Sequence, residues 1–178
     1  MRADLGIMIS ASHNPHHDNG IKFFGPDGFK LSDEAETEIE RLVFEGVDPA
    51  QAENIGRAKR IDDAGGRYVE YAKTTFPGAG GLRGLKVVVD CANGAAYKVA
   101  PQVLWELGAE VIPIGTNPNG FNINKGCGST DTTAAQQAVV TFGAHVGITP
   151  DRDADRLIVI AATGTAPDGP PAVGVVAP

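Results

Sequence analysis

The sequence predicts an α/β protein with a largely parallel sheet. Two observations carry this prediction: short apolar runs alternate with helix-like segments after residue 84, and the segment LKVVVD (85–90) is typical of a buried strand. The predicted strands are 85–90, 109–114, 144–148 and 156–161, and the predicted helices are 62–75, 95–107 and 131–142. Sheets of this kind bind ligands beyond the carboxyl ends of their strands.

The first 46 residues predict a smaller strand–strand–helix arrangement. The run LGIMIS (5–10) reads as a strand buried on both faces, and IKFFG (21–25) as a second short strand. Ser32 is a suitable N-cap, with acidic residues in the first turn after it, and Gly46 is a suitable end. The apolar stripe of this helix is Ala35, Ile39, Leu42 and Val43.

The polar, aperiodic stretch VDPAQAENIG (47–56) predicts a domain boundary. We therefore expect one domain over 1–56, a second over 57–161, and an irregular segment over 162–178, which is rich in Pro and Gly.

Composition narrows the class of protein. The chain has 178 residues, 42% hydrophobic and 21% charged, which are values of a globular protein. Its net charge of -7 argues against nonspecific nucleic-acid binding. No apolar run approaches the ~20 residues of a membrane span. The two cysteines, Cys91 and Cys127, have neither zinc-site nor disulfide-framework spacing, so we expect a reducing, cytoplasmic setting.

A strand followed by SASHNP (10–15) exposes a Ser–His pair, Ser12 and His13, on a loop. The Ser12 hydroxyl could act as a nucleophile or carry a covalent group. A Ser–His–Asp triad stays open, but adjacency in sequence does not give triad geometry. The histidines His13, His16 and His17 fit no standard zinc spacing.

The segment PDRDADR (150–156) places Asp151, Asp153 and Asp155 between two predicted strands. Two unit charges ~4 Å apart repel by about 4 kcal/mol at an effective dielectric of 20. A hard cation, Mg²⁺ or Ca²⁺, removes this repulsion and prefers oxygen ligands. An EF-hand is excluded because Arg156 and Ala162 stand where it requires Gly and Glu. The alternative is a solvated acidic turn.

The strand-to-helix turn DCANGAA (90–96) could offer N–H groups to an anion or could simply pack a helix on the sheet. It matches neither the P-loop nor the G-x-G-x-x-G pattern.

Taken together, ISASHNPHHDNGIKFF, DCANGAAYKVA, NPNGFNINKGCGSTD and DRDADRLIVI resemble the phosphohexomutase superfamily, and their wording points to its phosphoglucosamine mutase branch. The resemblance covers roughly residues 4–161. It implies three-layer α/β/α domains, with 1–56 the end of a first domain, carrying the phosphoserine loop, and 57–161 a near-complete second one that ends in the metal-binding loop. Phosphomannomutase/phosphoglucomutase, or a non-catalytic remnant that binds metal or phosphosugar, are the alternatives.

The resemblance also implies a mechanism. Ser12, as phosphoserine, donates its phosphate to glucosamine 6-phosphate, and the glucosamine 1,6-bisphosphate intermediate returns the other phosphate to leave glucosamine 1-phosphate, a precursor for peptidoglycan. Mg²⁺ is held by Asp151, Asp153, Asp155 and the Ser12 phosphate. Lys22 and His13 match positions near the reacting hydroxyl, and Arg156 could steady the phosphate.

Arg152 stands where the family usually has glycine. If that position requires positive φ, Arg152 is strained there, and its charge competes with a cation, so we expect weakened Mg²⁺ binding.

The resemblance does not extend to the family's third and fourth domains, which hold the sugar and the distal phosphate. We therefore expect little mutase turnover from the 178-residue chain alone. The measurement is a coupled assay for glucosamine 1-phosphate on the purified protein, and robust turnover would contradict the expectation.

Overall fold

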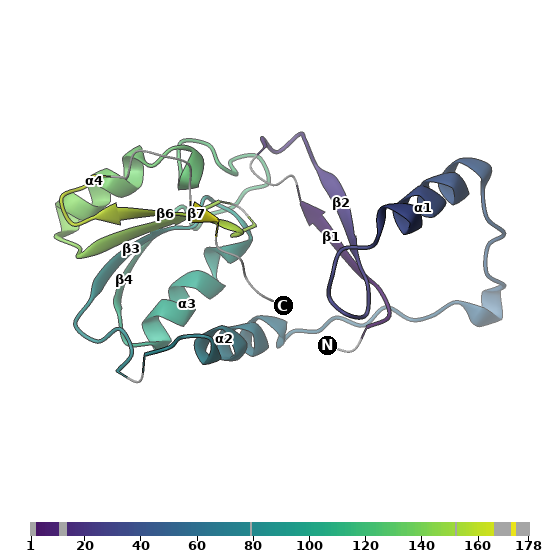
Figure 1. Ribbon diagram of the computed structural model, residues 1–178, viewed down its shortest axis with the longest axis horizontal. Coiled ribbons are helices and arrows are strands. Elements are labelled where there is room, and N and C mark those ends of the chain that lie inside the picture. The colour runs from purple at the N-terminus through teal and green to yellow at the C-terminus, as the bar shows by residue number, and fades with distance from the viewer. Residues whose placement is uncertain (1–2, 11–13, 79, 152, 166–171, 174–178) are drawn as a thin grey trace. The chain divides into compact units, whose positions relative to one another are not determined.

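The computed structural model describes residues 3–10, 14–78, 80–151, 153–165 and 172–173. The chain divides into two compact units (Figure 1). The first unit contains the residues up to Ile9 and Gly20–Asp62, and the second contains Ser10–Asn19 and the chain from Asp63 onward. Ser12, His13 and Arg152 lie outside the described residues.

The first unit is built on a two-stranded sheet, β1 (Gly6–Ser10) with β2 (Gly20–Phe24), followed by helix α1 (Asp33–Glu45). The last residue of β1, Ser10, is grouped with the second unit. The Ser32 hydroxyl accepts the N–H of Ala35 at 3.3 Å, which caps the helix N-terminus. Gly46 has φ 85° and donates its N–H to the Leu42 carbonyl at 2.9 Å. These contacts confirm the predicted start and end of this helix.

Two expectations about apolar burial in the first unit are wrong. Ile7 and Ile9 of β1 are 62% and 75% exposed rather than buried on both faces. Among the described residues β1 pairs only with β2, so alternate side chains point to a face of this small sheet that no second layer covers. Val43 of α1, expected on the buried stripe of the helix, is also exposed. No residue of this helix is deeply buried.

The second unit contains a five-stranded sheet in the order β4-β3-β5-β6-β7. Strand β3 is parallel to its two neighbours β4 and β5, whereas β6 is antiparallel to both β5 and β7. This mixed sheet confirms the predicted α/β class. Its strands are β3 (Lys86–Asp90), β4 (Glu110–Ile114), β5 (Val146–Pro150), β6 (Arg156–Ala161) and β7 (Ala172–Val173).

Helices cover both faces of this sheet, which confirms a three-layer arrangement (Figure 1). On one face, α4 (Thr133–Phe142) packs its Ala135 and Val139 against Val88 and Ile160. On the other face lie α2 (Ala64–Thr74) and α3 (Val99–Glu106). An apolar cavity of about 240 Å³ on that side is lined by Tyr68, Val99, Val103, Val89, Ile148 and Ala154.

Several element bounds differ from the prediction. Strand β5 continues to Pro150 instead of ending at 148, because Pro150 still pairs with Leu157 of β6. The helix predicted over 95–107 is a 3₁₀ turn, Ala95–Tyr97, followed by α3. A second 3₁₀ turn, Ala52–Asn54, lies in the polar stretch, and β7 lies in the segment expected to be irregular. Within the described ranges, none of the helices has the length and apolar character that a membrane crossing requires.

The two free cysteines are buried beside Asp90 in the second unit. Burial, followed by the charge of Asp90, raises the pKa of Cys91 to about 12 and that of Cys127 to about 11. At pH 8 both thiols are therefore protonated and, being buried, unreactive. We expect iodoacetamide to leave the native protein unmodified at pH 8 and to alkylate both cysteines in urea, as measured by intact mass. Rapid stoichiometric labelling of the native protein would contradict this burial.

Candidate metal centre

The acidic turn joins β5 to β6 and is clamped at both ends. The Asp151 N–H donates to the Arg156 carbonyl at 3.2 Å, which continues the pairing of the two strands past Pro150. The Ala154 N–H donates back to the Asp151 carbonyl at 3.1 Å, and Ala154 takes φ 62° to close the turn. The antiparallel strands thus hold Asp151 and the described residues that follow it, Asp153–Asp155, in a tight reversal.

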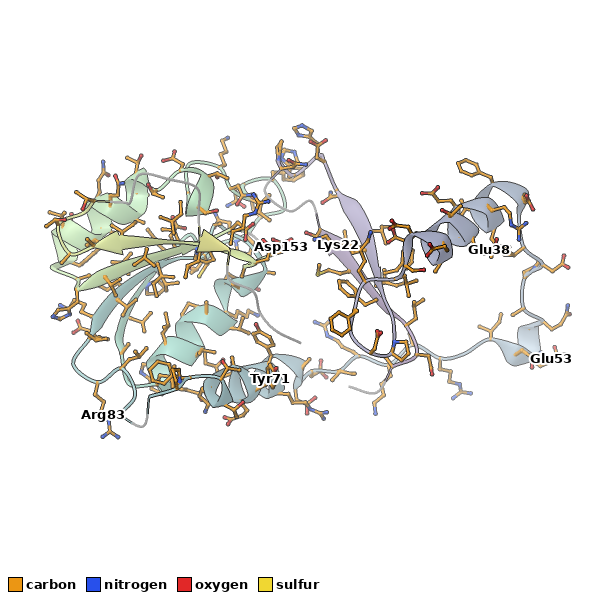
Figure 2. The ribbon with its side chains drawn as sticks, in the orientation of Figure 1. Lys22, Glu38, Glu53, Tyr71, Arg83 and Asp153 are labelled. Atoms are coloured by element: carbon orange, nitrogen blue, oxygen red, sulfur yellow. The ribbon has the colours of Figure 1, made fainter. Side chains whose placement is uncertain are left out.

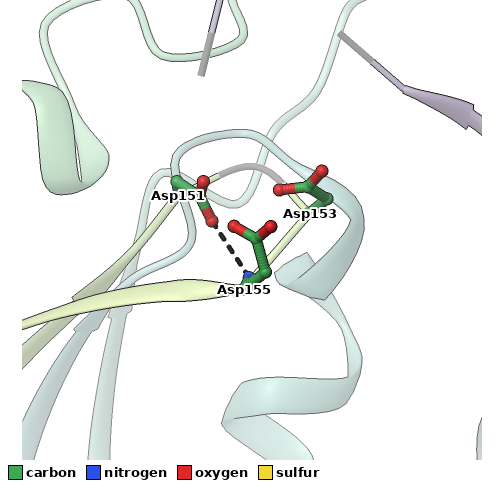
Figure 3. A group of neighbouring side chains, drawn as sticks. All are labelled: Asp151, Asp153 and Asp155. Atoms are coloured by element: carbon green, nitrogen blue, oxygen red, sulfur yellow. Dashed lines mark hydrogen bonds between the residues drawn. The ribbon is translucent and has the colours of Figure 1, made fainter. Parts of the chain in front are cut away.

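This reversal brings the three predicted carboxylates together (Figure 3). One oxygen from each of Asp151, Asp153 and Asp155 lies within 4.8 Å of the others. Asp151 is completely buried, Asp153 is half-buried and Asp155 is exposed. The triad therefore runs from the interior of the second unit to its surface.

Asp151 has one satisfied oxygen and one unsatisfied oxygen. Its Oδ1 accepts the N–H groups of Asp155 at 3.2 Å and of Arg156 at 3.3 Å. Its Oδ2 is buried and has no hydrogen-bond partner. Burial, a side-chain interaction with the Asp155 carboxyl and the charges of Asp153 and Asp155 raise the pKa of Asp151 to about 6, against the lowering effect of the Arg156 N–H.

This set of donors fits a hard divalent cation. All three ligands are carboxylates, the kind that Mg²⁺ and Ca²⁺ prefer. A buried carboxylate oxygen without a partner is costly, and a cation beside it would supply the missing interaction.

Ser10, the last residue of β1, belongs to the same unit as the triad. Its hydroxyl donates to Oδ2 of Asp153 at 2.8 Å, across 143 positions of sequence. The segment that begins the SASHNP motif is therefore in contact with the acidic turn. Ser12 and His13, two and three positions further along, are among the residues that the structure does not describe.

The remaining predicted site residues are placed as follows. Arg156 is the first residue of β6, directly after the triad, and is half-buried. Lys22 lies on β2 in the first unit and is also half-buried (Figure 2). The structure thus brings the three aspartates together with Ser10 and Arg156 inside one unit.

The histidines near the loop show no zinc site in the described part of the chain. The ring of His16 packs edge-on against Phe121 at 5.4 Å and against His17 at 5.2 Å. Among the described residues, three or more metal-ligating side chains gather only at the aspartate triad.

For the turn DCANGAA (90–96), the structure supports packing on the sheet over anion binding. Three of the turn's N–H groups are taken by the protein: Ala92 donates to Asp90, Asn93 to the Gly115 carbonyl, and Gly94 to the Cys91 carbonyl. This turn packs the chain rather than offering these donors to an anion. Its first residue, Asp90, is completely buried, and no sequence motif marked it as a functional residue.

Comparison with known proteins agrees with this architecture. Residues 1–49 match the model of domain I, and residues 66–164 that of domain II, of phosphoglucomutase/phosphomannomutase α/β/α domains. Phosphoglucosamine mutases of Paracoccus denitrificans and Cereibacter sphaeroides are 69% and 68% identical over 169 residues, 95% of this chain. The chain spans 38% of the length of these relatives.

Among solved structures, a phosphoglucomutase/phosphomannomutase family protein from Burkholderia thailandensis superposes with a TM-score of 0.72 at 26% identity. The match covers 93% of this chain and 35% of that one. The domain II match alone takes in more than half of the chain and includes the acidic turn. The chain belongs to the phosphoglucomutase/phosphomannomutase family.

Proposed function

We propose that this chain carries the phosphoserine and metal portion of a phosphoglucosamine mutase, which interconverts glucosamine 6-phosphate and glucosamine 1-phosphate. The observation that carries the proposal is the aspartate triad with its unsatisfied buried oxygen on Asp151, in contact with the SASHNP segment through Ser10. The identity of 69% to the Paracoccus phosphoglucosamine mutase supports the choice of sugar.

The metal in this proposal is Mg²⁺, held by Asp151, Asp153, Asp155 and an oxygen of the Ser12 phosphate. When bound, it neutralises charge on the phosphoryl group during transfer. The protein's own contribution is the turn, which keeps the carboxylates together despite their repulsion. A phosphate at Ser12, with about -1.5 to -2 charges at pH 7, adds to this negative charge and increases the need for a cation.

The group transfer in this proposal balances as follows. The bond between the Ser12 oxygen and phosphorus breaks while a bond from the free sugar hydroxyl to phosphorus forms. The hydroxyl proton passes to a base, for which Lys22 and His13 are the candidates, and the Ser12 oxygen accepts a proton. The bisphosphate then returns its other phosphate to Ser12 by the reverse step. The Arg156 guanidinium is suited to hold phosphate oxygens.

Phosphomannomutase and phosphoglucomutase remain the second candidate, because the matching family model carries those names. All of these reactions take place on soluble sugar phosphates, and two free cysteines suit a reducing compartment, so we propose a cytoplasmic setting.

Bound Mg²⁺ should stabilise the folded chain. Mg²⁺ at about 100 times its Kd should add about 2.7 kcal/mol to the free energy of unfolding, because it binds only the folded triad. Asp151→Asn should abolish this gain, since it removes one negative charge and one ligand oxygen. Thermal unfolding followed by circular dichroism, with and without Mg²⁺, measures both effects.

The matched control is Asp63→Asn, which removes an exposed carboxylate of the same unit that pairs with Arg67 at 2.7 Å. It should keep the full response to Mg²⁺. An equal response in Asp151→Asn would contradict the proposed metal site.

Ser12 should be the residue that carries the phosphoryl group. Treatment with glucose 1,6-bisphosphate should add one phosphoryl group to the protein, detected by intact-mass spectrometry. Ser12→Ala should lose this adduct because the accepting hydroxyl is gone. Ser32→Ala, which removes the exposed N-cap hydroxyl of α1, should keep it.

An adduct that persists in Ser12→Ala would contradict the assignment of the carrier. No adduct in the unaltered chain would favour a non-catalytic remnant that binds metal or phosphosugar.

A further inference from the structure

Asp90 is a second buried carboxylate at the same edge of the sheet as the triad. It ends β3, the strand that runs parallel to β5, and β5 leads directly into Asp151. Its side chain is completely buried. Both of its oxygens accept backbone N–H groups: Oδ1 from Ala92 at 3.0 Å and Oδ2 from Gly128 at 2.8 Å.

The hydrogen bond from Gly128 to Asp90 joins residues 38 positions apart and fixes a segment that lies against the acidic turn. A Cβ built on Gly128 would stand 2.5 Å from the Cβ of Ala92 and 3.1 Å from the carbonyl oxygen of Pro150. Gly128 also has φ 73°, which a larger residue adopts only with strain. Gly128 is therefore wedged between the turn after β3 and the last residue of β5.

From these contacts we infer that Asp90 is a positioning residue for the acidic turn. It acts through Gly128 on Pro150, and through Pro150 on Asp151. The inference deepens the proposed function and rests on it where metal binding is concerned. Asp90 is not among the three clustered carboxylates, and each of its oxygens already accepts a backbone N–H group.

The chemistry of the site favours a carboxylate over an amide here. A buried charge is costly unless it is hydrogen-bonded, and Asp90 receives two N–H donors from two segments. An asparagine has one acceptor oxygen, so its NH₂ group would face one of the two N–H donors. One of the two segments would then be released, with little change in side-chain volume.

The test measures hydrogen exchange in the acidic turn and does not require metal. In the full chain, the N–H groups of Asp155 and Arg156 donate to Asp151 and report on the turn. With Asp90→Asn, hydrogen exchange of these two amides, followed by NMR without metal, should rise about tenfold, the effect of losing one hydrogen bond. Gly128→Ala, which acts on the same link, should give the same local change. Exchange in α1 and α4 should stay as in the unaltered chain.

The second measurement is Mn²⁺ affinity by titration calorimetry. Both variants should bind Mn²⁺ about tenfold more weakly, as for outer residues that orient metal ligands. Asp63→Asn, an exposed carboxylate of the same unit, should change neither exchange at the turn nor Mn²⁺ affinity.

The outcomes separate the two proposals. Unchanged exchange at Asp155 and Arg156 in both variants would overturn the inference. So would a uniform rise in exchange across the second unit, which would make Asp90 a general scaffold residue. If the turn loosens selectively but the unaltered chain binds no Mn²⁺, Asp90 keeps its positioning role and the metal site of the proposed function is contradicted.

Discussion

The burial of Asp151 beside two further carboxylates is the constraint on which the candidate site depends. A buried carboxylate needs compensation, and Oδ1 obtains it from two backbone N–H groups while Oδ2 obtains none. The raised pKa of Asp151, to about 6, expresses the same imbalance, which begins with burial and is increased by its acidic neighbours. The turn is thus held in a form that a cation would stabilise more than water does.

Asp90 and Asp151 show how similar positions serve different purposes. Both follow or end parallel neighbouring strands, and both are completely buried. Both oxygens of Asp90 accept N–H groups of the protein, so this carboxylate joins two segments and neither oxygen lacks a partner. Asp151 retains a bare oxygen, so it can bind a ligand. The backbone donors that reach each carboxylate, rather than the residue type, decide between support and ligation.

The sequence predicted most of the second unit because periodicity and spacing are local signals. The strand-helix alternation and the aspartate triad of this unit follow from residues close together in the chain, as does the Ser32 cap of α1 in the first unit. Long-range contacts carry no such signal. The exposed face of Ile7 and Ile9 depends on what covers a sheet, and the role of Asp90 depends on an N–H group 38 positions away. Asp90 was visible only as an acidic residue that ends an apolar strand, a weak sign of function.

The position of the acidic turn explains why its carboxylates cannot relieve their repulsion by moving apart. Strands β3, β4 and β5 are parallel, and the direction reverses between β5 and β6, where the acidic turn lies. Because Pro150 pairs with Leu157, and Asp151 bonds to Arg156, both ends of the acidic turn are fixed. Widening the turn would break sheet hydrogen bonds as well as those to Asp151. The sheet therefore maintains the concentration of charge, and binding a cation requires little rearrangement of the chain.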